Sequence, residues 1–531
     1  MTESPVRGLG RRALLRRVGL AAGAMGLGAI AAACGTDRVP FIGTIGKRSG
    51  GTLVFGNTGD IVSPDPVTSG GDSFSVVAVL LLHEGLVAYN EDLELKPRLS
   101  TSWEVSETAW TFKLRQGVKF HDGTPFDAAA VRAHWERLMA PGSAMGGSWN
   151  PYVERVEAID AATVRFTTKF PDAFFLSRLA SPDAAIVSPA AVQKYGKDIT
   201  KNPVGTGPFV FSEWVKDERF VATRNEAYWG EKALLDKVVV RPIPDTQARV
   251  IALESGDVHV ARQLNPEHIA QLEKNPRIGV LVRPTTRSLF MGMHMPTKPF
   301  NDARVRQALN YAVDRDSIVK NIYLGAAEPL VGPVSPGAAG YSPMTGFKYD
   351  PAKAKQLLAE AGYPSGFTAT MIATKGAYLK DSELQQAVQQ YARAVGVTLN
   401  IEPVEFAKFI TYMRAPVATS GLQIWQDSWG GTDAAWFMGH YRCDQFRPEG
   451  FNRHGYCHGR ATELVKQAER TTDVTKRDAL LKEAAQLITD DAASLWLLVT
   501  KQVVGTAKTV RDLFLPRTGT LLVTERTWLE A

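Results

Sequence analysis

Five residues that could bind a metal ion or form a disulfide lie close together in the last quarter of the sequence. They are His440, Cys443, His454, Cys457 and His458. Thiolate and imidazole groups are preferred ligands of zinc and also bind nickel. The two cysteines could instead form a disulfide, with the histidines beside it at the surface. The residues alone leave both interpretations open.

The sequence patterns of common enzymes are absent. No Gly-x-Ser-x-Gly motif for a nucleophilic serine occurs. His83 and Glu84 are followed by Val87, where a zinc protease would have its second histidine. Gly205 and Gly207 lack the third glycine of a dinucleotide-binding loop. Glycosidase carboxylates have no local pattern, so a secreted hydrolase stays as a distant alternative. The sequence therefore predicts a protein that is not an enzyme and needs no cofactor.

The net charge argues against a nucleic-acid partner. The chain carries a formal charge of +6, and 22% of its residues are charged. Five arginines against one glutamate give residues 1–33 a charge of +4, which leaves +2 for the rest. A body so nearly balanced lacks the basic surface that a phosphate backbone requires.

Residues 1–33 have the order of an export signal. Arginine pairs at 11–12 and 16–17 precede the uncharged residues 18–33, a run too short to span a membrane. The pairs resemble a twin-arginine signal, although the general secretory route also uses a charged region. Residues 31–34 (AAAC) resemble a lipobox, with Ala31 where leucine is usual. Cys34 is therefore the predicted lipidation site, although a cysteine could also follow the cleavage signal by chance. Residues 34–51 are predicted to be a flexible spacer.

Export bears on the two remaining cysteines. An oxidising compartment removes the thiolates that a metal would need, so a disulfide between Cys443 and Cys457 is favoured and no metal site is predicted. Such a bond closes a loop of 15 residues, which stabilises the fold by about 3 kcal/mol in the chain-entropy model.

The pattern of apolar residues predicts an α/β body. Strands are expected at 53–55, 110–114 and 238–240, with a short helix near 128–138. Helices are then expected from Asp302 to about Gly325, from Asp350 to Gly362, and over 382–395 before a strand at 397–401. Two further helices, near 461–470 and 475–490, precede a strand at 496–504. Alternation of this kind is typical of an α/β lobe.

Several segments together resemble the family of bacterial extracellular solute-binding proteins that serve peptide and nickel importers of the ABC type. The most specific is 110–126 (WTFKLRQGVKFHDGTPF), in which Phe112 and Leu114 are expected to point to a core. The others follow in the family's order: 95–99 (LKPRL), 102–105 (SWEV), 204–209 (VGTGPF), 224–229 (RNEAYW) and 299–308 (PFNDARVRQA). The resemblance runs from about residue 52 to 505.

The resemblance implies a two-lobed periplasmic-binding-protein fold of type II, cluster C-like, with an extra subdomain in the first lobe. Lobe I would comprise 52–89, 196–285 and 503–531, its subdomain 90–195, and lobe II 286–502. The crossings between lobes are expected near 283–287 and 500–504. A fold of this kind closes on its ligand by a hinge motion.

The family's cleft is lined by a strand end that contains Trp and Gly. The matching residues here are Trp425, Trp429, Gly431, Thr432, Asp433 and Trp436. Trp425 and Trp436 could equally pack in a core, whereas Trp429 is expected to face the ligand. Peptide-binding members commonly have an aspartate at the position of Thr432, where its carboxylate pairs with the peptide's amine. Asp433 is one residue further along, which on a strand reverses its face.

The resulting hypothesis is a monomeric, extracytoplasmic receptor, anchored to the cell membrane by a lipid at Cys34. It would capture di- or oligopeptides and deliver them to the permease subunits of an ABC importer. The same receptor could carry a nickel chelate, an oligosaccharide or another non-peptide solute instead. A surface chaperone or sensor that uses the same cleft is a further alternative.

Overall fold

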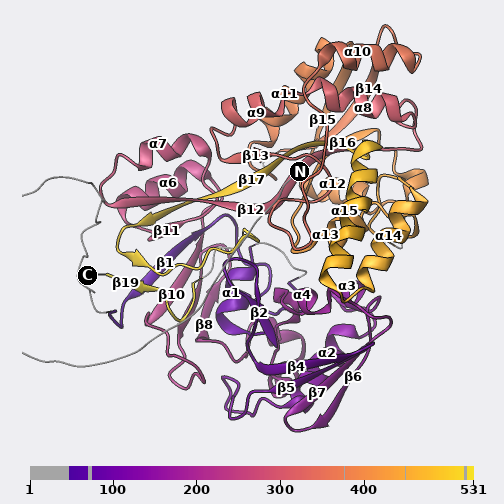
Figure 1. Ribbon diagram of the computed structural model, residues 1–531. Helices are drawn as coiled ribbons and strands as arrows, with labels where there is room; N and C mark the ends of the chain where they lie inside the picture. The colour runs from indigo at the N-terminus through magenta and orange to yellow at the C-terminus, as the bar shows by residue number, and fades with distance from the viewer. Residues whose placement is uncertain (1–46, 70–73, 376, 449, 520–522, 531) are drawn as a thin grey trace, which may run out of the picture. The chain divides into compact units, whose positions relative to one another are not determined.

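A computed structural model describes residues 47–531, except for 70–73, 376, 449, 520–522 and 531 (Figure 1). The predicted export signal at 1–33, Cys34 and the first part of the predicted spacer lie outside the described residues. Within the described part of the chain, no helix has the length and apolar character needed to cross a membrane.

The largest element is an eleven-stranded sheet of order β15-β14-β16-β12-β17-β11-β1-β10-β9-β8, with β13 paired to β17. One half, here called the first lobe's sheet, contains β1 (Thr52–Asn57), β8 (Phe209–Val215), β9 (Arg219–Arg224), β10 (Lys237–Pro242) and β11 (Val260–Ala261). The predicted strands at 53–55 and 238–240 lie in β1 and β10. Leu53 and Phe55 are buried because alternate side chains of β1 point to the same face.

Two long strands cross from one half of the sheet to the other. β12 (Ile278–Met293) and β17 (Ser494–Ala507) pair antiparallel from one end to the other. Their register shifts between Pro284 and Ser288, so the regular ladder is interrupted in the middle of the pair. β11 adds to one end of this pair and β16 to the other. In Figure 1 the pair runs through the centre of the drawing.

The other half, here called the second lobe's sheet, contains β14 (Phe367–Thr374), β15 (Val397–Val404) and β16 (Ile424–Trp429). Helices α8 (Ala303–Ala312), α10 (Pro351–Glu360) and α11 (Asp381–Ala394) begin close to the predicted positions. The first predicted helix does not continue to Gly325. It ends at Ala312, and the side chain of Asp314 accepts a hydrogen bond from the Ser317 amide, which caps a separate helix.

The segment with the most specific family pattern forms part of a separate four-stranded sheet of order β4-β5-β7-β6. β5 (Ala109–Leu114) buries Phe112 and Leu114 as predicted. Their core is aromatic: Phe166 lies 5.6 Å from Phe112 and 5.0 Å from Trp135 of α2 (Ala128–Met139), between ring centroids. Asp122 accepts hydrogen bonds from Thr124 and Ser188 and fixes the turn after β5. These residues serve the scaffold.

The remaining elements connect and cover these sheets. The other strands are β2 (Val87–Tyr89), β3 (Leu95–Pro97), β4 (Ser100–Ser106), β6 (Val153–Asp160), β7 (Thr163–Thr168), β13 (Ala327–Pro329), β18 (Val510–Arg511) and β19 (Trp528–Leu529). The other helices are α1 (Val76–Leu82), α3 (Gly146–Trp149), α4 (Phe175–Leu179), α5 (Pro189–Tyr195), α6 (Thr246–Ser255), α7 (Ile269–Leu272), α9 (Arg315–Asn321), α12 (Phe406–Arg414), α13 (Ala434–Gly439), α14 (Gly459–Glu469) and α15 (Val474–Asp490).

Candidate ligand-binding site

The predicted binding segment begins where β16 ends beside β12. Ser288 of β12 pairs with Trp429, and its hydroxyl donates to the Trp429 carbonyl at 3.1 Å. The glycines that follow allow close packing: a Cβ on Gly431 would lie 2.5 Å from the Trp436 ring. A Cβ on Gly430 would lie 3.7 Å from the guanidinium of Arg287. This strand end therefore lies directly against the point where β12 crosses between lobes.

The structure assigns different roles to the predicted tryptophans. Trp425 has no exposed surface and packs with Phe409, Met413 and other apolar side chains, so it cannot contact a ligand in this structure. Trp429 is 6% exposed, and the His440 ring stacks on it at 3.9 Å. Most of the Trp429 surface is thus used in packing, and its contact with a ligand stays a prediction. Trp436 is partly exposed.

Asp433 is engaged by its own helix. Its side chain accepts a hydrogen bond from the Trp436 amide at 2.8 Å and so caps α13. The side chain is buried, and burial raises the pKa of Asp433, whereas the charge of Arg178 lowers it. Asp433 therefore caps α13, and its contact with a ligand stays a prediction.

Thr432 is partly exposed and lies close to Tyr89 of β2. Burial raises the pKa of the Tyr89 hydroxyl, and polar interactions with Ser177 and Thr432 lower it. The Ala173 amide donates to the Glu469 carbonyl at 2.7 Å. Tyr89 and Ala173 both belong to the part of the chain that the resemblance assigns to lobe I and its subdomain.

Arg287 is the functional candidate that sequence reasoning did not single out. Its side chain is exposed, yet desolvation by the surrounding protein lowers its pKa. Both observations hold if the exposed surface faces a space enclosed by protein. Among the described residues the phenol of Tyr378 is the one group that offsets this effect electrostatically, and no ion pair is formed.

Further arginines lie on the loop between the two cysteines. Arg453 forms an ion pair with Asp427 of β16 at 2.9 Å. Burial, together with the charges of Arg453 and Arg414, lowers the pKa of Arg447 to about 10, although the charge of Asp427 raises it. The Nε of Arg447 is buried without a hydrogen-bond acceptor among the described residues. Tyr378 interacts with Asp427, Arg287 and Arg453, so these groups form one cluster.

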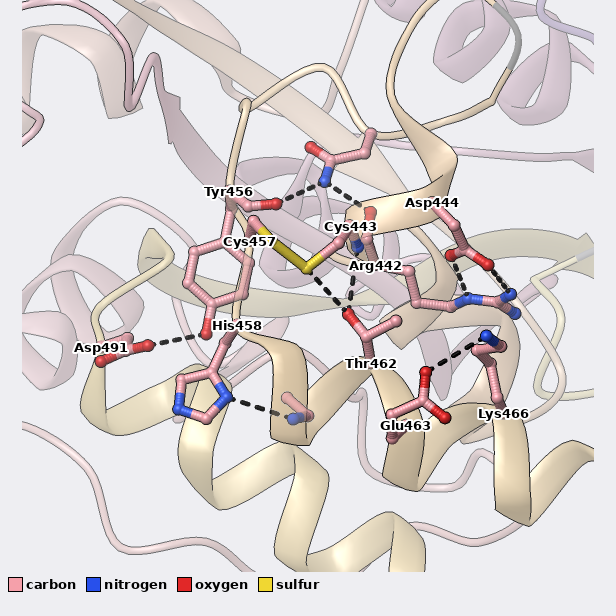
Figure 2. Close-up of a disulfide and its surroundings, with 12 residues drawn as sticks. Arg442, Cys443, Asp444, Tyr456, Cys457, His458, Thr462, Glu463, Lys466 and Asp491 are labelled. Carbon is pink, nitrogen blue, oxygen red and sulfur yellow. Dashed lines mark hydrogen bonds and ion pairs between the residues drawn. A yellow bond between two sulfur atoms is a disulfide. The ribbon is translucent and has the colours of Figure 1, made fainter.

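That loop is closed by the predicted disulfide, which the structure confirms. Cys443 and Cys457 are bonded, with Cα atoms 4.6 Å apart. Figure 2 shows Thr462 of α14 beside the bond, where its hydroxyl donates to the Cys443 sulfur. His458 accepts a hydrogen bond from the Ala461 amide and caps α14. The cysteines are therefore not thiolate ligands, and no group of three or more metal-binding side chains occurs within the described ranges.

A cavity lies beside the register shift of β12 and β17. It has a volume of about 200 Å³ and is lined by residues of both long strands, including Thr285 and Thr500, and by Pro336 and Arg517. The Thr285 hydroxyl donates to the Thr500 carbonyl at 2.6 Å, which ties the two strands together beside the cavity. Space for a small molecule thus exists next to the crossing, two residues from Arg287.

An α/β fold in two lobes, with charged groups and a cavity where two strands cross between them, defines a solute-binding protein of the periplasmic type. The model of the bacterial extracellular solute-binding proteins, family 5 Middle, matches residues 94–445. The glutathione-binding protein GsiB of Escherichia coli (strain K12) is 32% identical over 459 residues, which cover 84% of this chain and 89% of that protein. The chain belongs to this family.

Solved structures agree with the assignment. The ABC transporter-associated periplasmic binding protein DppA from Helicobacter pylori, in complex with the peptide STSA, is 30% identical with a TM-score of 0.78, covering 91% of this chain and 99% of that one. The protein AgaA from A. tumefaciens R10, in complex with agropinic acid, is 27% identical with a TM-score of 0.76, over 91% and 99%. The predicted two-lobed fold is confirmed, and the chain is a substrate-binding protein of the class that works with ABC importers.

Proposed function

We propose that this protein captures short peptides between its two lobes and delivers them to an ABC importer. The observation that carries the proposal is the similarity over most of the chain to a protein named for glutathione, itself a tripeptide.

The lobes divide, in this proposal, at the crossings 283–287 and 500–504, with residues 90–195 as a subdomain of lobe I. The register shift between Pro284 and Ser288 supports that division, since an interrupted ladder bends more readily than a regular one. The protein works as a monomer and carries out no turnover. Any solute bound to it is therefore released unchanged when the protein is denatured.

A non-peptide organic acid is the second candidate cargo. Thr432 stands where peptide-binding members have an aspartate, and the neighbouring Asp433 caps α13, so neither residue offers a carboxylate to a peptide amine. The relative that binds agropinic acid at 27% identity supports this alternative. A nickel chelate or an oligosaccharide would need polar groups of a different kind.

The location of the protein in the cell is also part of the proposal. Cys34 carries a lipid that tethers the protein to the outer side of the cell membrane, and the arginine pair at 11–12 directs export by the twin-arginine route. Metabolic labelling with a radioactive fatty acid tests the lipid, because label is expected in the wild type and not in Cys34→Ser. Replacement of both arginines by lysine is expected to stop export if the twin-arginine route is used.

Native mass spectrometry of the purified protein tests the cargo. A mixture of co-purified peptides is expected, and the measured mass also reports whether the protein is a monomer. Thermal unfolding with added glutathione, the tetrapeptide Ser-Thr-Ser-Ala or nickel–histidine then ranks the classes. A ligand at 100 times its Kd stabilises by about 2.7 kcal/mol, which raises the unfolding temperature measurably. A single non-peptide species, with no shift from either peptide, would refute the peptide proposal.

A further inference from the structure

Arg287 is a charged side chain with no opposite charge beside it. It leaves β12 at the crossing between lobes, and its guanidinium lies against Gly430. The one electrostatic neighbour that favours its charge is the phenol of Tyr378, which is neutral at physiological pH. No carboxylate among the described residues forms an ion pair with it.

The surrounding charges do not compensate for it. Tyr378 also interacts with Asp427 and Arg453, which are paired with each other at 2.9 Å. Arg447 is close enough to both to be affected by their charges, and it stacks its guanidinium 5.3 Å from the Phe451 ring. Asp381 also interacts with Tyr378, so three guanidinium groups share two carboxylates in this cluster, which leaves one positive charge in excess.

This excess favours the approach of an anion. Arg287 is exposed, so water solvates it in the free protein, and a solute that displaces this water offsets the cost of desolvation with a negative charge of its own. The guanidinium presents donors in a planar fork that matches a carboxylate, and two parallel hydrogen bonds can form. An arginine kept unpaired beside a glycine at a strand end is therefore suited to receive an acid group from outside the chain.

The geometry points to Arg287 as the residue that binds a free carboxylate of the solute, with Arg447 and Arg453 selecting for solutes of net negative charge. This inference rests on the proposed function and names the chemical class within it. Suitable solutes are short peptides with a free C-terminal or side-chain acid, and small organic acids built on the same pattern. An amidated or esterified solute would leave Arg287 unpaired.

The test compares acid and blocked forms of the same peptides. Ser-Thr-Ser-Ala and its C-terminal amide form one pair, and glutathione and its diethyl ester, in which both carboxylates are blocked, form the other. Calorimetry on the wild type is expected to give about 10–100-fold tighter binding of the free acids, the range for a hydrogen bond to a charged group. Arg287→Gln is expected to lose that preference, and Arg287→Lys to keep part of it, because lysine keeps the charge without the fork.

Arg132→Gln is the matched control. Arg132 lies on the exposed side of α2 and forms a surface ion pair with Glu136 at 3.6 Å, so the same change of charge there is expected to leave affinity unaltered. Unfolding temperatures of all variants establish that they are folded. Arg447→Gln is expected to weaken binding of acids by a smaller factor that shrinks at high salt.

The outcomes separate the inference from the proposed function. Equal binding of acid and blocked peptides, or an acid preference that survives in Arg287→Gln, would overturn the role of Arg287 while leaving peptide capture intact. Binding of neither form would refute peptide capture. In that case the solute that co-purifies with each variant tests the role of Arg287. An acid that is bound by the wild type and Arg132→Gln but not by Arg287→Gln supports this role. Any other solute overturns it.

Discussion

Trp429 illustrates that a sequence pattern does not contain the packing around a side chain. Side chains alternate along a strand, so Trp425, Asp427 and Trp429 share one face of β16. The sequence does not say what covers that face. In the structure His440, Tyr441 and His454 cover it, and these residues come from a segment that follows the strand in the chain. The packing partner, rather than the periodicity, decides that the tryptophan is buried.

Removing the Trp429 side chain should therefore affect stability first. Trp429→Ala is expected to lower the free energy of unfolding by about 3–5 kcal/mol, the usual cost of truncating a large buried aromatic side chain. Trp436→Ala should cost less, because its ring is partly exposed. Urea denaturation measures both. A Trp429→Ala variant as stable as the wild type but weak in ligand binding would restore the ligand-facing role.

The arginines show the opposite limit of sequence reasoning. Averaged over the chain, the charges outside the first 33 residues nearly cancel, which argues against a nucleic-acid partner. An average charge does not show a local excess of positive charge. Arg287 and Arg453 are far apart in the sequence and come together around Tyr378 only in the folded protein. The one local indication of this charge in the sequence is the density of arginine in 442–453, within the segment whose cysteines predict the disulfide.

At the scale of elements, the loop closed by Cys443 and Cys457 carries both Arg447 and Arg453. Asn452 holds its interior, donating to the carbonyls of Arg442 at 2.9 Å and Tyr456 at 2.8 Å. The sequence predicted this disulfide because export and the spacing agreed. It could not predict the loop's position beside β16, which depends on the ion pair between Arg453 and Asp427.

Opening the loop should loosen these arginines. The double variant Cys443→Ser, Cys457→Ser is expected to lose about 3 kcal/mol of stability, from the loop-closure entropy restored to the unfolded chain. Affinity for an anionic solute should fall as well, since the loop then pays an ordering cost on binding. Calorimetry and urea denaturation provide the two measurements. Unchanged affinity with reduced stability would mean that Asn452 and Asp427 suffice to position the loop.

Helices were the most predictable elements, and the one clear error concerns a boundary. The apolar spacing before Gly325 continues across Asp314, but an aspartate whose side chain accepts from the Ser317 amide begins a new helix there. Capping residues occur within helical patterns as well as at their ends. A boundary of this kind follows from backbone geometry, which the pattern of apolar residues does not contain.

At the scale of the whole molecule, several histidines are buried in the neutral form. Burial lowers the pKa of His83 and His121 to about 4, and that of His134 and His440 to about 3. In the unfolded chain these groups take up protons below their ordinary pKa of 6.5, whereas the folded protein binds none until much lower pH. Their neutral burial therefore adds no penalty above pH 6.5 and destabilises the fold progressively as the pH falls.

The free energy of unfolding should therefore decrease as the pH falls below 6.5. Each buried histidine is expected to reduce stability by about 1.4 kcal/mol per pH unit between pH 6.5 and its folded-state pKa. Urea denaturation at pH 7 and pH 5.5 measures the total. His134→Asn keeps an acceptor for the Val187 amide, which donates to His134 Nδ1 at 3.3 Å, and removes one titrating group. A variant with the same pH dependence as the wild type would contradict this account.

The central position of β17 has a consequence for the order of synthesis. β17 lies between β12 and β11 in the middle of the large sheet, yet it follows every other strand of that sheet in the chain. A ribosome therefore makes both edges of the sheet before it makes the strand that joins them. Until residues 494–507 emerge, the nascent chain holds two unjoined half-sheets with unpaired inner edges, and such edges bind chaperones or aggregate. Translation has to pass this strand before a single eleven-stranded sheet can exist.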